Sequence, residues 1–163
     1  MAKNKEIKTN AMRILDGLKI VYQSYFYECD EFIDAGKIAD LLSLEHELVY
    51  KTLVTRAASK NIYVFVIPID RELDLKKAAK VVGEKNIEMI AVKEINALTG
   101  YIRGGCTAIG MKKKYVTHID DSAQFLEQIV VSGGKIGVQL KLTPNDLLRA
   151  CDGKYASVTV EVS

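Results

Sequence analysis

The chain has 163 residues, 48% of them hydrophobic, which is enough for one globular domain with its own core. A net charge of +2 excludes polyanion binding by the surface as a whole, so any such binding requires a local basic patch. The three cysteines, Cys29, Cys106 and Cys151, lack CxxC or zinc-ligand spacing, which argues against both a disulfide framework and a metal site.

The first half of the chain is predicted to contain two helices and three strands after a polar, flexible arm at residues 1–8. Apolar residues spaced at i, i+3 and i+4 indicate the helices, and runs of β-branched and aromatic residues indicate the strands. In chain order these are a helix over 11–18 capped by Asn10, a strand over 20–27, a helix over 35–42 capped by Asp34, and a hairpin of strands 49–56 and 62–69.

The second half continues this mixture of helices and strands. In chain order we expect a helix over 75–82 between Asp74 and Gly83, a strand over 87–90, a helical segment over 91–98, a strand over 115–119, a short helix from Asp121 or Ser122, strands over 129–132 and 136–142, a helix opened by Thr143 and Pro144 and ended by Gly153, and a strand over 157–162.

Irregular alternation, two prolines and no linker rich in serine or glycine favour one mixed α/β (α+β) domain over residues 1–163. The short spacings between strands suggest a mixed or partly closed sheet rather than a doubly wound parallel one. The longest apolar run, residues 62–69, is too short to span a bilayer, and no apolar leader follows the N-terminus. We therefore expect a soluble cytoplasmic protein.

A glycine-dense loop over residues 99–114 leads directly into three lysines, Lys112, Lys113 and Lys114. Glycines let the main chain approach a ligand closely, and the lysines, together with Arg103, are the only charged side chains between Glu94 and Asp120. The pattern predicts a site for a phosphate or an oxyanion. The alternative is a surface loop followed by a solvated lysine run.

Few other residues suggest chemistry. Lys51 alternates with Leu53 along one face of a predicted strand, so it needs an anionic partner or a ligand unless it extends to solvent at the sheet edge. The histidines, His46 and His118, and the loop thiol of Cys106 have no partner at triad spacing, so no catalytic triad is predicted.

Several of these segments, taken in order, resemble the YbaK/EbsC family of free-standing aminoacyl-tRNA deacylases, which is similar to the editing domain inserted in bacterial prolyl-tRNA synthetases. The resemblance extends over about residues 8–160. The matching segments are Tyr27-Glu28, Val49-Tyr50-Lys51-Thr52-Leu53, Leu73-Asp74-Leu75-Lys76-Lys77-Ala78-Ala79-Lys80, Thr99-Gly100-Tyr101, Gly104-Gly105-Cys106, Gly110-Met111-Lys112-Lys113 and Val131-Ser132-Gly133-Gly134-Lys135.

The resemblance implies a barrel-like mixed sheet with flanking helices, and hydrolysis of the ester of mischarged tRNA, typically Cys-tRNA(Pro), without a metal, a cofactor or a protein nucleophile. Mischarged tRNA is then the partner, with prolyl-tRNA synthetase as a further candidate. By this resemblance and the local chemistry, the expected site residues are Lys51, Gly104 and Gly105 in catalysis, Tyr27, Thr52, Thr107, Ser132 and Gln139 in substrate binding, and Arg103, Lys112, Lys113 and Lys114 in tRNA binding.

Two departures leave the amino acid open. Thr107-Ala108 stands where many family members have Ser-Pro, and Gln139 stands where some have Asp. Cys-tRNA(Cys), or a tRNA carrying another small amino acid such as alanine, therefore remains an alternative substrate. A non-catalytic RNA-binding or regulatory protein on the same fold is the alternative of a different class.

Overall fold

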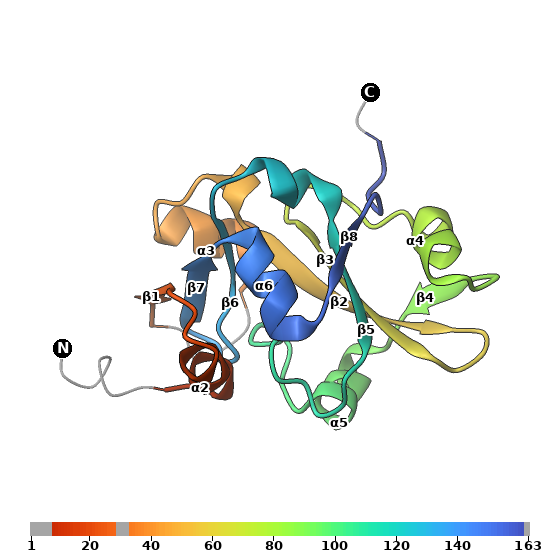
Figure 1. Ribbon diagram of the computed structural model, residues 1–163, viewed down its shortest axis with the longest axis horizontal. Helices are drawn as coiled ribbons and strands as arrows, with labels where there is room; N and C mark the ends of the chain where they lie inside the picture. Colours follow the sequence, from red (N-terminus) through yellow and green to blue (C-terminus); the bar gives the residue numbers. More distant parts are fainter. Residues whose placement is uncertain (1–7, 29–32, 162–163) are drawn as a thin grey trace.

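A five-stranded mixed sheet lies at the centre of the computed structural model, which describes residues 8–28 and 33–161 (Figure 1). β2 pairs antiparallel with β3 and β4, whereas β3–β5 and β5–β8 are parallel pairs. Across the sheet the strands are β4 (Ile87–Met89), β2 (Tyr50–Ala57), β3 (Ile62–Pro68), β5 (Val116–Asp120) and β8 (Lys154–Ala156).

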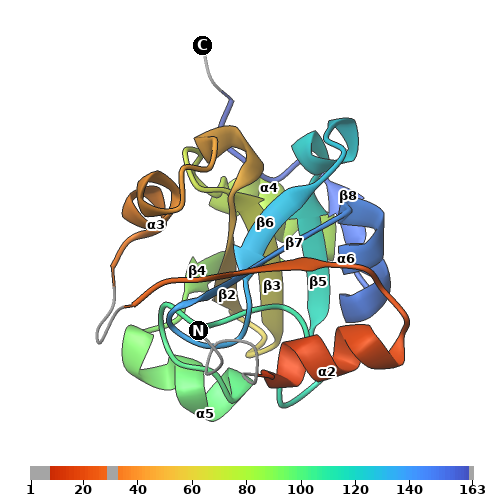
Figure 2. The ribbon, with the colours of Figure 1, turned by 90° about the vertical axis from the view of Figure 1, so that its left-hand side faces the viewer.

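A second, antiparallel sheet of three strands packs against one face of the first (Figure 2). It contains β1 (Gln23–Phe26), β7 (Val138–Leu142) and β6 (Ile129–Ser132), in that spatial order. A parallel bridge between Val49 and Val130 joins the two sheets. The mixed α/β class predicted from the sequence is confirmed, with the described strands divided between two sheets instead of one.

The helices cover both layers, and three of the predicted N-caps are confirmed. The helices are α2 (Asn10–Gly17), α3 (Ala35–Leu41), α4 (Leu75–Val82), α5 (Ile95–Thr99) and α6 (Pro144–Cys151), with short 3₁₀ helices η1 (His46–Leu48), η2 (Val92–Glu94) and η3 (Asp121–Phe125). The side chains of Asp34, Asp74 and Thr143 accept hydrogen bonds from the first turns of α3, α4 and α6.

Two predicted helix ends were wrong by one residue. Thr9 caps α2 through a 3.1 Å bond from the N–H of Met12, while the side chain of Asn10 donates instead to the carbonyl of Gly110. The left-handed residue that ends α6 is Asp152, with φ of 55°, where Gly153 was predicted. Asparagine and aspartate tolerate both capping and left-handed positions, so composition alone does not separate neighbouring candidates.

The last strand, predicted over 157–162, was also misplaced, and residue 162 lies outside the described residues. β8 ends at Ala156, and the chain beyond it is held by a 3.2 Å bond from the N–H of Val158 to the buried carboxylate of Asp120.

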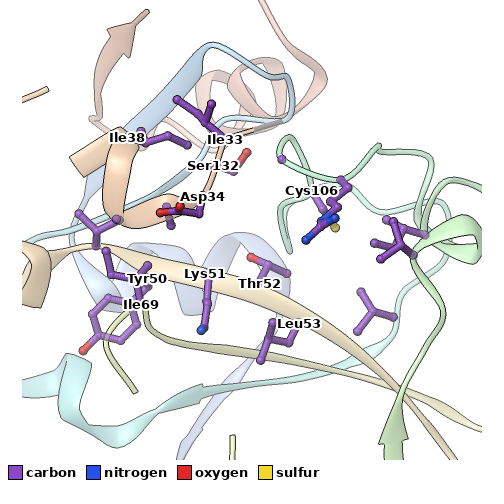
Figure 3. Close-up of a pocket in the computed structure, with 18 of the residues that line it drawn as sticks. Ile33, Asp34, Ile38, Tyr50, Lys51, Thr52, Leu53, Ile69, Cys106 and Ser132 are labelled. Atoms are coloured by element: carbon purple, nitrogen blue, oxygen red, sulfur yellow. The ribbon is translucent and has the colours of Figure 1, made fainter. Parts of the chain in front are cut away.

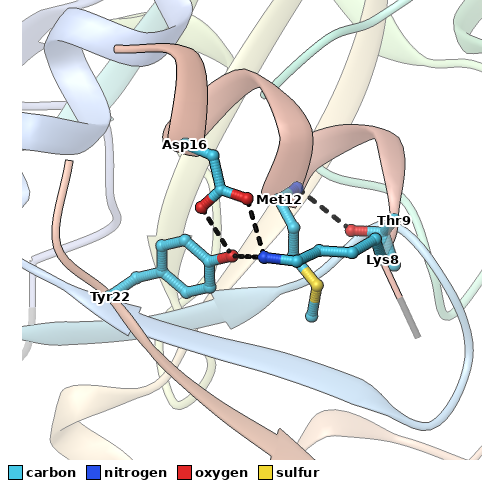
Figure 4. A network of polar contacts seen from close by, with 5 residues as sticks. All are labelled: Lys8, Thr9, Met12, Asp16 and Tyr22. Atoms are coloured by element: carbon cyan, nitrogen blue, oxygen red, sulfur yellow. Dashed lines mark hydrogen bonds and ion pairs between the residues drawn. The ribbon is translucent and has the colours of Figure 1, made fainter. Parts of the chain in front are cut away.

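Of the predicted arm, residues 1–7 lie outside the described residues. Lys8 is bound to the carboxylate of Asp16 at 2.7 Å and to the hydroxyl of Tyr22 at 3.3 Å (Figure 4).

Alternation along the central strands divides the core in two. On one face of β3, Phe65 and Ile67 pack with Ala78 and Ala79 of α4. Val64 and Val66, on the other face, join the larger core between the two sheets, together with residues of α2 and α6. No helix within the described ranges has the length and apolar character needed to cross a membrane.

The glycine-dense loop is anchored against α2 at Gly110. This residue has φ of 73°, and an added Cβ would overlap the terminal methyl of Ile14 and lie 2.7 Å from the amide nitrogen of Asn10. Gly83 has nearly the same φ, 74°, but open space where its Cβ would be. A comparison of alanine variants at the two positions therefore separates the cost of backbone strain from the cost of steric overlap.

We predict that Gly110→Ala lowers the free energy of unfolding by about 3 kcal/mol, because it adds overlap to strain. Gly83→Ala should lower it by only about 1 kcal/mol. Urea unfolding followed by circular dichroism measures both. Equal losses in the two variants would contradict the packing of this loop on α2.

Candidate active site

A cavity of about 470 Å³ lies where the two sheets, the N-terminus of α3 and the glycine-dense loop meet (Figure 3). Five consecutive residues of β2, Tyr50–Val54, line it. Consecutive side chains of a strand point to opposite faces, so a strand lines a cavity with every residue only when its edge borders that cavity. The floor of the site is therefore the edge of β2.

This edge is paired at both ends and open between them. At one end Val49 bridges to Val130, and at the other the carbonyl of Val54 accepts a 3.2 Å bond from the N–H of Ile90. Even-numbered residues of β2 thus direct their N–H and C=O groups toward the gap, which is roughly 13 Å long at the rise of a strand. Thr52 occupies its middle, so its main-chain groups face the cavity.

The cavity has a polar centre between two apolar ends. Gly104, Cys106, Ser132 and Gln139 provide the polar centre, together with Thr52. The apolar lining residues at the α3 end are Ile33, Ile38, Val49 and Ile69, and those near β4 and α5 are Met89, Ile90, Val92 and Ile95. The carboxylate of Asp34, which caps α3, also lines the α3 end. A polar reacting group with an apolar group on either side fits this distribution.

Lys51 lines the cavity and is half-buried, and no ion pair with another described residue satisfies it. The strand alternation places it on the Leu53 face, as predicted. Figure 3 shows Thr52 on the side of β2 that faces Cys106 and Ser132, with Lys51 leaving the strand on the opposite side. The ammonium is thus placed beside the strand edge rather than directly opposite the glycine loop.

Gly104 and Gly105, the two predicted oxyanion donors, differ in this structure. The N–H of Gly105 already donates a 2.9 Å bond to the carbonyl of Ile102, so it is not available to a ligand. Gly105 is required for another reason, because a Cβ there would lie 2.9 Å from the Cα of Lys135. Gly104 lines the cavity with φ of 88°, and its N–H has no acceptor among the described residues.

Of the predicted substrate-binding residues, the structure brings Thr52, Ser132 and Gln139 to the cavity. Ser132 and Gln139 are directly opposed on β6 and β7, which places them on one face of the small sheet. Thr107 is fully buried behind the loop, where its hydroxyl accepts from the N–H of Ile109, and it does not line the cavity.

Tyr27 follows β1 and is not among the cavity-lining residues, although its hydroxyl is buried without a hydrogen-bond partner. Tyr25, which no motif singled out, is paired with Gln139 across β1 and β7. Since directly opposed residues share a face, Tyr25 lies on the same face of the small sheet as Gln139. Residues two apart in a strand also share a face, which extends this face toward Tyr27.

The predicted tRNA-binding cations are divided between two places. Arg103 lines the cavity, whereas Lys113 and Lys114 line a separate open groove of about 680 Å³. Lys112 lines neither, and its ammonium donates to the carbonyl of Ala97 at 3.3 Å. Arg56 and Lys60 from the β2–β3 hairpin also line the groove. They are distant in sequence from Lys113 and Lys114, so only the tertiary fold shows that these cations lie together.

Neither histidine lines the cavity, and both have structural surroundings. His46 lies between the carboxylates of Asp40 and Asp70, whose hydrogen bonds raise the pKa of its imidazole. His118 stacks on Phe65, and burial lowers its pKa. Within residues 8–28 and 33–161, no group of three His, Cys, Asp or Glu side chains is placed to hold a metal ion.

The comparisons with known proteins agree with this geometry. Residues 32–150 match the family model described as the aminoacyl-tRNA editing domain. The chain belongs to the aminoacyl-tRNA editing domain family. It is also 43% identical, over 99% of both chains, to EbsC from Enterococcus faecalis, a protein named as a candidate Cys-tRNA(Pro)/Cys-tRNA(Cys) deacylase.

Solved structures show the same fold. One is the crystal structure of a candidate trans-editing enzyme for prolyl-tRNA synthetase, with a TM-score of 0.78 and 20% identity over 96% of this chain and 100% of that one. Another is a hypothetical protein, with a TM-score of 0.83 and 20% identity over 91% of this chain and 97% of that one. The family resemblance and the fold expected from the sequence are thereby confirmed.

Among the described residues, Cys106 is the one thiol in the cavity lining, and burial raises its pKa to about 11. We predict that Cys106→Ser retains deacylation within about threefold of the wild type, because a protonated, buried thiol is a poor nucleophile. In a Cys29→Ser background, iodoacetamide should label Cys106 slowly until the pH approaches its pKa. Rapid labelling at pH 7 together with loss of activity in Cys106→Ser would contradict this.

Proposed function

We propose that the protein hydrolyses the ester that joins cysteine to tRNA(Pro), as a trans-editing member of its family of aminoacyl-tRNA deacylases. The 43% identity to EbsC over nearly the full length supports the substrate. The observation that carries the proposal is the open edge of β2 at Thr52, which lines the same cavity as Gly104, between largely apolar ends. The reaction is placed in the cytoplasm, with prolyl-tRNA synthetase as the source of the mischarged tRNA.

In the proposed reaction, the ester carbonyl lies between β2 and the glycine-dense loop. The N–H groups of Gly104 and Thr52 donate to the developing oxyanion, and Thr52 thus replaces Gly105 in the role predicted from the sequence. A water molecule attacks the carbonyl carbon and gives free cysteine, or the thiol of the substrate attacks and gives a cyclic thioester that water then opens to cysteine. In either case the ester C–O bond breaks, and the proton of the attacking water or thiol passes to the tRNA oxygen, which leaves as a hydroxyl. An ester is already activated, so alignment and oxyanion stabilisation are sufficient.

Alanine is the alternative amino acid, since Thr107-Ala108 and Gln139 depart from the family pattern. Purified protein should be incubated with Cys-tRNA(Pro), Ala-tRNA(Pro) and correctly charged Pro-tRNA(Pro), and the release of each amino acid measured. We expect cysteine to be released at least about tenfold faster than alanine or proline. Faster release of alanine would make alanyl-tRNA the substrate in place of Cys-tRNA(Pro). Binding of tRNA without release of any amino acid would favour a non-catalytic RNA-binding protein.

Lys51 is proposed to hold the terminal nucleotide or the polar region of the ester. Lys51→Ala should lower kcat/KM for Cys-tRNA(Pro) by about 10²-fold, because a half-buried cation without a protein partner is available to an anionic ligand. Lys80→Ala, on the exposed side of α4, is the matched control and should behave as the wild type. Unchanged turnover in Lys51→Ala would contradict the proposed role of Lys51 in substrate binding.

The predicted tRNA-binding lysines are tested by salt dependence. Replacing Lys113 and Lys114 by Gln should raise KM and reduce the slope of log KM against log salt by about 1 to 2, since each phosphate contact releases counterions. The double variant Lys80→Gln and Lys85→Gln carries the same charge change on another surface. Identical slopes in both double variants would exclude the groove from tRNA binding, and single variants of Arg103 and Lys112 extend the same assay.

A further inference from the structure

The cavity is too large for the amino acid alone. A small amino acid, taken at roughly 30 Å³ for each non-hydrogen atom, fills about half of the 470 Å³. The remaining volume must take the next part of the substrate if the cavity is to be filled. In an aminoacyl-tRNA ester, that part is the terminal nucleoside, an adenosine.

The two apolar ends of the cavity differ in exposure. At the α3 end, Ile38 and Val49 are only 5% and 1% exposed, and Ile33 and Ile69 are half-buried, although the side chain of Asp34 there is exposed. At the other end, Met89 and Val92 are 45% and 53% exposed, although both line the cavity. A substrate that continues into a long tRNA leaves the cavity at its exposed end, so the amino acid belongs near α3 and the nucleoside near β4.

The exposed end is held in position by the protein. The guanidinium of Arg56 makes two bonds, of 2.8 and 3.2 Å, to the carboxylate of Glu94, which also accepts from the N–H of Ala91. These contacts fix η2 to β2. If the pairing of β2 with β4 continued, residue 92 would lie opposite Thr52, but the chain turns into η2 at this point. Val92 is therefore both close to the reacting centre and displayed at the opening.

The positive charge of the neighbouring groove also favours a tRNA that leaves the cavity at its exposed end. Ile95 of α5 lines the cavity, and Leu98, about one helical turn later, lines the open groove. Among the residues that the structure describes, the groove is lined by four cations, Arg56, Lys60, Lys113 and Lys114, and by no acidic residue. Three carboxylates contact its lining: Glu94 pairs with Arg56, Asp152 with Lys114, and Glu84 accepts from Tyr63 and Asn61. Lys60 and Lys113 have no ion-pair partner among the described residues, so these two lysines are the groups that phosphates would meet next to the exposed end.

We infer that Met89 and Val92, with Ile90 and Ile95 behind them, form the subsite for the terminal nucleobase of the aminoacyl-tRNA. This inference rests on the proposed function. The purine ring lies against the aliphatic side chains, its ribose ester reaches Thr52, and the phosphate backbone leaves toward the groove. Burial of Met89 and Val92 by the base accounts for two exposed apolar side chains in the wall of a cavity.

Val92→Ser and Met89→Gln test the subsite with little risk to folding, because both side chains are about half exposed. We expect each to raise KM for Cys-tRNA(Pro) about fivefold, with kcat nearly unchanged, through the loss of apolar contact. Cysteine ethyl ester lacks the nucleobase, so its enzymatic hydrolysis should be unaffected. Adenosine should inhibit the wild type competitively, and Val92→Ser should raise its inhibition constant by a similar factor.

Val160→Ser is the matched control, since Val160 is 42% exposed and lines neither the cavity nor the open groove. Equal KM values for Val92→Ser and Val160→Ser, with wild-type release of cysteine intact, would overturn the subsite and leave the proposed function standing. Equal losses on the tRNA and on the ethyl ester would instead place the amino acid against Val92. Absence of any release by the wild type would remove the function and the subsite together.

Discussion

The open edge of β2 is the constraint on which the site depends. A strand edge normally pairs or is covered, because its N–H and C=O groups need partners. Here β6 approaches the edge at Val49 and β4 leaves it after Val54, and the cavity occupies the interval between them. The polar groups of the edge are thus left open to a ligand, and the same strands that build the core fix their position.

The rest of the site follows from how this interval is enclosed. The small sheet supplies Ser132 and Gln139 on one side, and the glycine-dense loop supplies Gly104 on another. The loop can approach only because Gly105 lacks a side chain against Lys135. Burial raises the pKa of Cys106 to about 11, which argues against this thiol as a nucleophile. In the proposed reaction the protein therefore contributes alignment and hydrogen-bond donors. Alignment and hydrogen-bond donation suit an ester substrate, because an ester is already activated toward hydrolysis.

Local features were well predicted from the sequence, whereas those that depend on tertiary contacts were not. The caps Asp34, Asp74 and Thr143 were predicted because a capping side chain and its helix lie within a few residues. The family motifs likewise pointed to Lys51, Thr52, Gly104 and Ser132, all of which line the cavity. The same motifs could not show that the N–H of Gly105 is already bonded to Ile102. Met89 and Val92 carry no motif, and only the end of β4 beside β2 brings them to the site.

The most direct test is an NMR titration of the ¹⁵N-labelled protein with a non-hydrolysable amide analogue of cysteinyl-adenosine. Binding at the open edge of β2 predicts that the amide signals of Thr52 and Gly104 move most. The signals of Gly105, already bonded, and of Gly83, on the far side of α4, should move little. Large shifts in the groove around Lys113, with Thr52 and Gly104 unmoved, would contradict the assignment of the cavity as the active site.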